Sequence, residues 1–203
     1  MCDSDWSSDV CSSDLSPSKT PRTGRAMADS DESIAPLPSA LLLDTSFLRT
    51  LGGPSRARYR AFLDHIEENG IQLFLSRRVV EEVNEQQAYI GGGWLDVDEV
   101  TVLDPVQSGA RVYGGPSAAE VMDSAHERLA ELEQEEPDEL PKTDSALGGA
   151  AVMLLASKPH ETVGIVLDDG NAESTLLTVL QNTFYEDRIR VLNIWDVVEY
   201  VME

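Results

Sequence analysis

The sequence predicts an α/β fold: a three-layer α/β/α sandwich around a central, mostly parallel sheet of four to five strands. A short, continuous apolar run at 40–43 and largely apolar runs at 71–75 and 163–167 are typical of strands buried on both faces of a sheet. Segments with helical periodicity or helix-capping residues alternate with them. The length of 203 residues suffices for one domain with a hydrophobic core and not clearly for two.

Two further segments complete the predicted sheet. We expect a strand at 189–192, whereas 100–103 is either a short strand or an extended link. Between the first strand and the first helix, Thr45, Ser46 and Gly52–Gly53 indicate a turn region.

Capping residues and helix breakers set the predicted helices. Pro54 suits the first position of a helix that Gly70 ends, and Ser76 can cap the next. Ser117 and Glu120 have the spacing of a capping box, and Thr143 can cap the helix after it. The expected helices are 54–69, 77 to about 90, 118–136, 144–157, 171–181 and 195–202.

The N-terminal segment is not expected to belong to the fold. Residues 5–15 read DWSSDVCSSDL, which resembles a translated sequencing adapter and would place the natural start at Met27. A disordered, acidic and serine-rich tail is the alternative, and it predicts the same absence of structure. We therefore assign 1–26 to an extension, 27–38 to a disordered leader and 39–203 to the folded domain. Both cysteines, Cys2 and Cys11, lie in the extension, so neither a disulfide nor a cysteine zinc site is expected in the domain.

The charge of the chain is strongly negative. There are 37 acidic and 15 basic residues, a formal net charge of -22, and the acids are scattered along the whole chain. So many like charges repel one another unless salt screens them, which indicates a protein of a high-salt cytoplasm. The alternative is an acidic protein that binds basic partners. The first residues have no secretory character and the apolar stretch 146–156 is too short to cross a bilayer, so we expect a cytoplasmic protein without a membrane partner.

Acidic residues follow the predicted strands. Asp44 comes directly after the first strand, and Asp168 and Asp169 come after the strand at 163–167. In open α/β sheets ligands bind outside the carboxyl ends of the strands, so these side chains are expected at one edge. Glu82 lies about two turns into its helix and Asp144 at the start of another, where a carboxylate favours the positive end of the helix dipole. Taken singly, each could be an ordinary turn or surface residue.

Carboxylates that converge at one edge repel each other unless a cation neutralises them. Hard oxygen ligands suit Mg²⁺ or Mn²⁺, and a pair of such ions can activate water and stabilise an in-line displacement at phosphorus. The three histidines have no metal-ligand spacing. The acids therefore predict divalent-metal chemistry on a phosphate ester.

Four short motifs, in order, resemble those of PIN domains. They are LLLDTSFL, SRRVVEEV, PKTDSALGGAAVMLLA and IVLDDG, and the resemblance covers residues 39 to 203. It implies a metal-dependent endoribonuclease, either the toxin of a toxin–antitoxin pair or an RNA-processing enzyme. It also implies catalytic roles for Asp44, Glu82, Asp144 and Asp169, with Asp168 added to the metal ligands. Leu167 stands where the family usually has Thr, which leaves the roles of Asp168 and Asp169 open against each other.

The resemblance also implies partners. RNA is the expected substrate, an antitoxin protein a candidate partner, and the family often forms homodimers. Phosphates would be bound by arginines near the acidic edge, which are Arg49, Arg56, Arg58, Arg60, Arg77 and Arg78. Alternatively these arginines form surface ion pairs.

Other enzyme classes fit less well. A haloacid-dehalogenase-type phosphatase requires Asp-x-Asp after its first strand, and Ser46 stands in the second position here. The alternative that we retain is a catalytically inactive PIN scaffold that binds RNA or protein.

Overall fold

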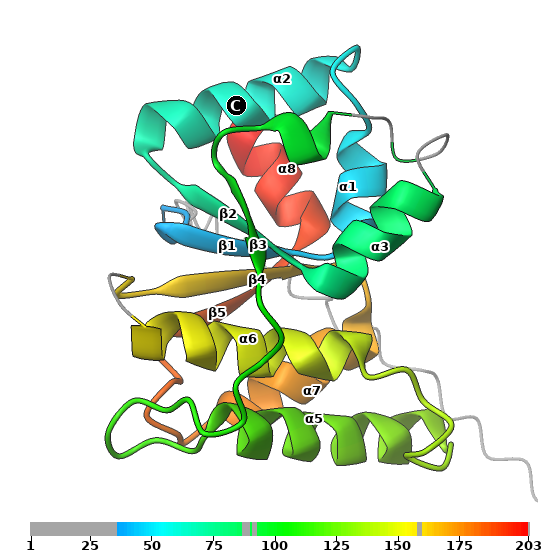
Figure 1. The fold of residues 1–203 in the computed structure, drawn as a ribbon, viewed down its shortest axis with the longest axis vertical. Helices are drawn as coiled ribbons and strands as arrows, with labels where there is room; N and C mark the ends of the chain where they lie inside the picture. Colours follow the sequence, from blue (N-terminus) through cyan, green and yellow to red (C-terminus); the bar gives the residue numbers. More distant parts are fainter. Residues whose placement is uncertain (1–35, 87–89, 91–92, 158–159, 203) are drawn as a thin grey trace, which may run out of the picture. The chain divides into compact units, whose positions relative to one another are not determined.

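Five parallel strands form one sheet at the centre of the fold (Figure 1). The structure is a computed structural model that describes residues 36–86, 90, 93–157 and 160–202, all within the compact unit Ile34–Glu203. The strands are β1 (Ala40–Leu43), β2 (Gln72–Ser76), β3 (Val100–Leu103), β4 (Val163–Leu167) and β5 (Ile189–Asn193), in the order β3-β2-β1-β4-β5. Every neighbouring pair is parallel. The predicted α/β class is confirmed, and the ambiguous segment 100–103 is the edge strand β3.

Helices cover both faces of the sheet (Figure 1). One layer contains α1 (Thr45–Leu51), α2 (Ala57–Asn69), α3 (Arg77–Glu85) and α8 (Ile194–Met202), and a short 3-10 helix, η1 (Trp94–Asp96), joins its core through Trp94. The other contains α5 (Ala118–Glu133), α6 (Thr143–Ser157) and α7 (Gly170–Leu180).

The alternation of side chains along β1 joins the sheet to both layers. Ala40 and Leu42 belong to the core beneath α5, α6 and α7, whereas Leu41 and Leu43 belong to the core beneath α1, α2, α3 and α8. Successive side chains of a strand point to opposite faces, so an apolar run without a polar position is what a strand covered on both faces requires.

The strand register aligns the carboxyl ends of β1, β2 and β4. Leu43 of β1 pairs with Leu75 of β2 and with Val166 of β4. The residues that follow these strands therefore lie at one edge of the sheet, where α3, α6 and α7 also begin and α5 ends (Figure 1).

The prediction of a turn at Thr45 and Ser46 is wrong, because both residues lie in α1. Asp44 is the N-cap of this helix, and Gly52, with a φ of 73°, ends it. Phe47, Leu48 and Leu51 are buried in the core, so tertiary packing stabilises a helix that is too short to be stable alone.

Other boundaries differ by a few residues. The segment from Pro54 forms a turn before α2 begins at Ala57, and α6 begins at Thr143 itself. Helix α5 ends at Glu133, where Gln134 adopts a left-handed φ of 58°. The extension 1–26 and most of the leader 27–38 lie outside the described residues. Among the described helices, none has both the length and the apolar character that crossing a membrane requires.

Candidate active site

A hollow of about 350 Å³ opens at the carboxyl edge of the sheet. Five acidic residues line it, each from a different element or junction: Asp44, Glu82, Glu133, Asp144 and Asp169. Four of them are acids that the sequence singles out, and we call this space the acidic hollow.

Two of these carboxylates are held by the helices that they begin. Asp44 Oδ2 accepts hydrogen bonds from the backbone N–H of Ser46 at 3.1 Å and from the Ser46 hydroxyl. Asp169 Oδ1 accepts from the backbone N–H groups of Asn171 at 2.7 Å and Ala172 at 3.0 Å. Each aspartate is thus an N-cap directly after a buried strand, and the cap orients its carboxylate.

Glu82 is oriented by a residue of α1. The hydroxyl of Thr45, which is 3% exposed, donates to Glu82 Oε2 at 2.6 Å. Ser76 caps α3 by accepting from the N–H of Val79, and the burial of Val79 and Val83 directs Glu82 toward the hollow while Glu81 stays exposed.

Asp144 has the most perturbed environment of the five. Its pKa rises to about 6, first because burial disfavours the charged carboxylate and then because of repulsion from Asp44, Asp169, Glu82 and Glu133. Each of the other four acids therefore interacts electrostatically with Asp144 across the hollow.

The structure separates Asp168 from Asp169. Both side chains are exposed, but Asp169 lines the hollow and Asp168 does not. Of the expected metal ligands, Asp168 is the residue that the fold does not bring to the others.

Two of the six arginines lie at the hollow. Arg49 lines it from α1 and donates to the side chain of Gln86, and Arg78 lines it with its Nε atom 3.8 Å from Glu82 Oε1. The other four do not line it. Arg58 donates to the carbonyl of Leu51, Arg77 lies 3.9 Å from Asp104, and Arg56 and Arg60 are exposed at the start of α2.

Glu133 was missed by the sequence reasoning. It is the last residue of α5, and Asn171 Nδ2 donates to its Oε1 at 3.1 Å. Its neighbours include Glu131, Glu135 and Glu136, so the local sequence has the character of a solvated acidic helix end. Only the packing of α5 beside α7 brings Glu133 to the hollow, and no local signal could have identified it.

The donor set fits a hard divalent cation. All five acids offer carboxylate oxygens, the ligands that Mg²⁺ and Mn²⁺ prefer, and Asp144 lies where a positive charge would relieve repulsion. Within the described parts of the chain, however, no three Asp, Glu, His or Cys side chains converge closely enough to enclose an ion. The carboxylates line the hollow from several sides without meeting at one point.

Comparison with known proteins agrees with the motifs. A family model described as the halobacterial PIN domain matches residues 37–203, which include every element from β1 to α8. No curated protein and no solved structure matches the chain.

Proposed function

The chain belongs to the halobacterial PIN domain family, and from this we propose that it is a metal-dependent endoribonuclease that cuts RNA phosphodiester bonds at the acidic hollow. The observation that carries the proposal is that five carboxylates from separate elements line one hollow, where burial and then the other four acids raise the pKa of Asp144. So many like charges in one place are unfavourable without a cation.

Asp44, Glu82, Asp144 and Asp169 would hold Mg²⁺ or Mn²⁺. When bound, the metal supplies Lewis-acid stabilisation of charge on the phosphate and activation of water. The caps at Asp44 and Asp169 keep these carboxylates at the mouth of the hollow, and Thr45 holds Glu82 in place. Glu133 adds negative charge beside Asp144 and Asp169, held by Asn171.

Arg49 and Arg78 would bind the RNA phosphates. Both line the hollow on the side of α1 and α3, and a guanidinium can donate two parallel hydrogen bonds to a phosphate. They offset the negative charge of the hollow for an anionic substrate, and bound metal contributes further attraction.

The same site would suit either of two biological roles, a toxin or an RNA-processing nuclease. A toxin would be held inactive by an antitoxin protein, whereas an RNA-processing nuclease would act without one, and either could work as a homodimer. A small reading frame directly upstream of the gene would favour the toxin.

The test is an RNA cleavage assay with the full chain in molar potassium chloride, because salt screens the repulsion among the acidic side chains. Labelled structured and unstructured RNAs are incubated with manganese or magnesium. We expect cleavage that is abolished by chelator and by Asp44→Asn. Asp123→Asn, which removes one exposed charge from α5, is the charge-matched control and should cut like the wild type.

A negative result would select the alternative. If folded wild-type protein cuts none of the RNAs, and divalent ions do not raise its melting temperature beyond the effect of potassium, catalysis is contradicted. The domain would then be a PIN scaffold that binds RNA or protein.

A further inference from the structure

Asp144 lies between the acidic hollow and a second, smaller space. Behind it, α5, α6 and α7 enclose a cavity with no room for a water molecule. Leu129, Asp144, Ser145, Ala172, Thr175 and Leu176 line this cavity, together with Ala125. Asp144 and Leu129 also line the hollow, so Asp144 contacts the site on one side and the protein interior on the other.

Thr175 contributes a buried hydroxyl that lacks a partner. The residue is 2% exposed, and its Oγ1 atom makes no hydrogen bond within the described structure. A helical threonine can donate to the carbonyl four residues earlier, and Thr178 of the same helix does so, to Ser174 at 2.8 Å. The Thr175 hydroxyl does not make this bond. Since a buried unpaired hydroxyl is unfavourable, its burial here calls for an acceptor.

The cavity offers few acceptors. Water does not fit, and the side chains around it are apolar apart from Asp144, Ser145 and Thr175 itself. The Ser145 hydroxyl already donates to the carbonyl of Lys142 at 3.2 Å. Asp144 is the group that most needs a donor, because its carboxylate is partly buried among four other acids.

We propose that Thr175 is a positioning residue for Asp144: its hydroxyl, which is unpaired in the structure, turns to donate to the inner carboxylate oxygen and keeps the outer oxygen directed into the hollow. The inference rests on the proposed function, since it gives Asp144 a cation to bind. A hydrogen bond of this kind reduces the freedom of a ligand before the metal arrives, and loss of such a bond typically weakens metal binding about tenfold to a hundredfold.

The experiment compares three variants of the full chain. Thr175→Val keeps the shape of the side chain and removes the hydroxyl, Thr175→Ser keeps the hydroxyl, and Thr178→Val removes the exposed hydroxyl one turn away. Calorimetry gives the Mn²⁺ affinity of each, and denaturant unfolding without divalent ions gives its intrinsic stability, both in molar potassium chloride.

We expect Thr175→Val to bind Mn²⁺ about tenfold or more weakly, and Thr175→Ser and Thr178→Val to stay within about threefold of wild type. Without metal, Thr175→Val should be less stable than wild type, because the partly buried carboxylate of Asp144 loses a hydrogen-bond donor. A role in packing alone would change stability and leave the affinity for Mn²⁺ unaltered.

Two negative outcomes are distinguishable. If wild type binds Mn²⁺ and Thr175→Val binds it equally well, this inference is overturned and the proposed function stands. The Thr175 hydroxyl then bonds to Ser145, or the residue contributes to packing alone. If wild type binds no Mn²⁺, the proposed function fails and the inference fails with it. Should Thr175→Val not fold, Thr175→Ser and Thr175→Ala form a second pair that differs by the hydroxyl alone, and equal affinities in that pair would overturn the inference.

Discussion

At the scale of single residues, Asp44 and Asp169 serve the fold and the site together. Each caps a helix through one carboxylate oxygen, so its position follows from helix formation directly after a buried strand. Asparagine caps a helix about as well as aspartate. Replacement by asparagine therefore removes the negative charge of the site while it retains the cap.

The adjacent residues Asp168 and Asp169 allow a direct comparison of two replacements by asparagine. We expect Asp169→Asn to lower RNA cleavage about a hundredfold or more, because a residue lining the hollow loses its charge. Asp168→Asn should stay near wild type, since Asp168 does not line the hollow. Cleavage rates measured at saturating manganese test this. A larger loss in Asp168→Asn would make Asp168 the metal ligand.

The raised pKa of Asp144 predicts how stability depends on pH without divalent ions. Its folded pKa of about 6 exceeds the unfolded value of about 3.9, so the folded state binds more protons between these values. The free energy of unfolding therefore falls as pH rises through this window and stays low above it.

Asp144→Asn should remove this fall in the free energy of unfolding, because asparagine does not titrate. We expect the variant to be more stable than wild type by about 1–2 kcal/mol near pH 7.5, with the gain disappearing near pH 4. Denaturant unfolding at constant potassium chloride measures the difference, and Asp123→Asn again controls for the loss of one charge. A gain equal at both pH values would show that Asp144 titrates normally.

At the scale of elements, short and largely apolar runs made four strands predictable. The edge strand β3 was ambiguous because it has only four residues and exposes Thr101 and Val102, so neither length nor burial distinguished it from a link. Helix α1 was missed because Asp-Thr-Ser and Gly52–Gly53 have the chemistry of turns. The burial of Phe47, Leu48 and Leu51 stabilises it, and that is a property of the tertiary fold.

In the site, too, local sequence predicts some residues, and tertiary packing determines the others. Asp44 and Asp169 follow strands, Asp144 lies at a helix start and Glu82 lies in the helix after β2, so the topology brings them to one edge. The choice between two adjacent aspartates after β4 depends on which of them caps α7 and lines the hollow, which spacing does not reveal. Likewise, the separation of Arg49 and Arg78 from the other four arginines depends on how α1 and α3 pack, and no sequence pattern encodes that.

Close packing between α5 and α6 depends on Gly149. A Cβ atom built at this position would lie 2.9 Å from the backbone oxygen of Ala118, at the start of α5, and a backbone atom cannot rotate away. This approach supports the helix pair whose ends carry Glu133 and Asp144.

Gly149→Ala should therefore destabilise the domain. We expect a loss of about 1–3 kcal/mol from the forced separation of the helices, even though alanine favours a helix over glycine by about 1 kcal/mol. Gly109→Ala, where an added Cβ meets nothing within 4 Å, should change stability little. Denaturant unfolding in high salt compares the two, and a Gly149→Ala protein as stable as wild type would contradict the close approach.

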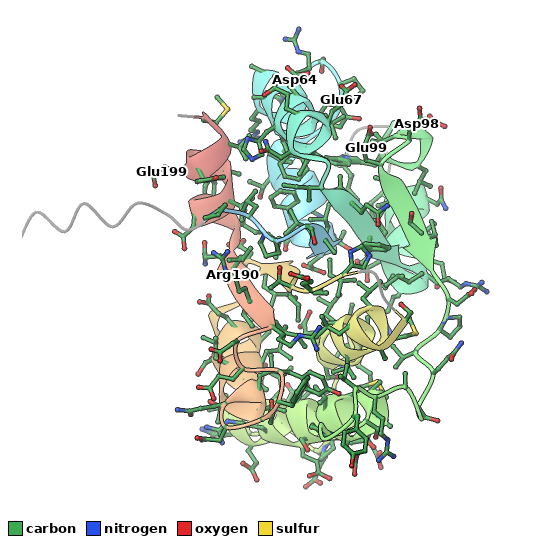
Figure 2. The ribbon with its side chains drawn as sticks, turned by 90° about the vertical axis from the view of Figure 1, so that its left-hand side faces the viewer. Asp64, Glu67, Asp98, Glu99, Arg190 and Glu199 are labelled. Atoms are coloured by element: carbon green, nitrogen blue, oxygen red, sulfur yellow. The ribbon has the colours of Figure 1, made fainter. Side chains whose placement is uncertain are left out.

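At the scale of the whole molecule, the negative charge extends well beyond the site. Figure 2 shows Asp64 and Glu67 on α2 and Asp98 and Glu99 just before β3 in the same part of the domain. Glu67, Asp98 and Glu99 border a second surface hollow. Such a surface agrees with membership of a halobacterial family and with the interpretation of the charge as an adaptation to salt.

The free energy of unfolding should therefore rise with potassium chloride between about 0.1 M and about 1 M, as the Debye length shortens from about 10 Å to about 3 Å. Salt can also strengthen apolar burial, and a charge variant separates the two causes. Replacing the acids at the second hollow (Glu67→Gln, Asp98→Asn, Glu99→Gln) removes repulsion and leaves the apolar core intact. If screening dominates, the triple variant exceeds wild type in free energy of unfolding most at low salt. Its free energy of unfolding then rises less steeply with potassium chloride than that of wild type. An equally steep rise in both proteins would assign the salt effect to apolar burial.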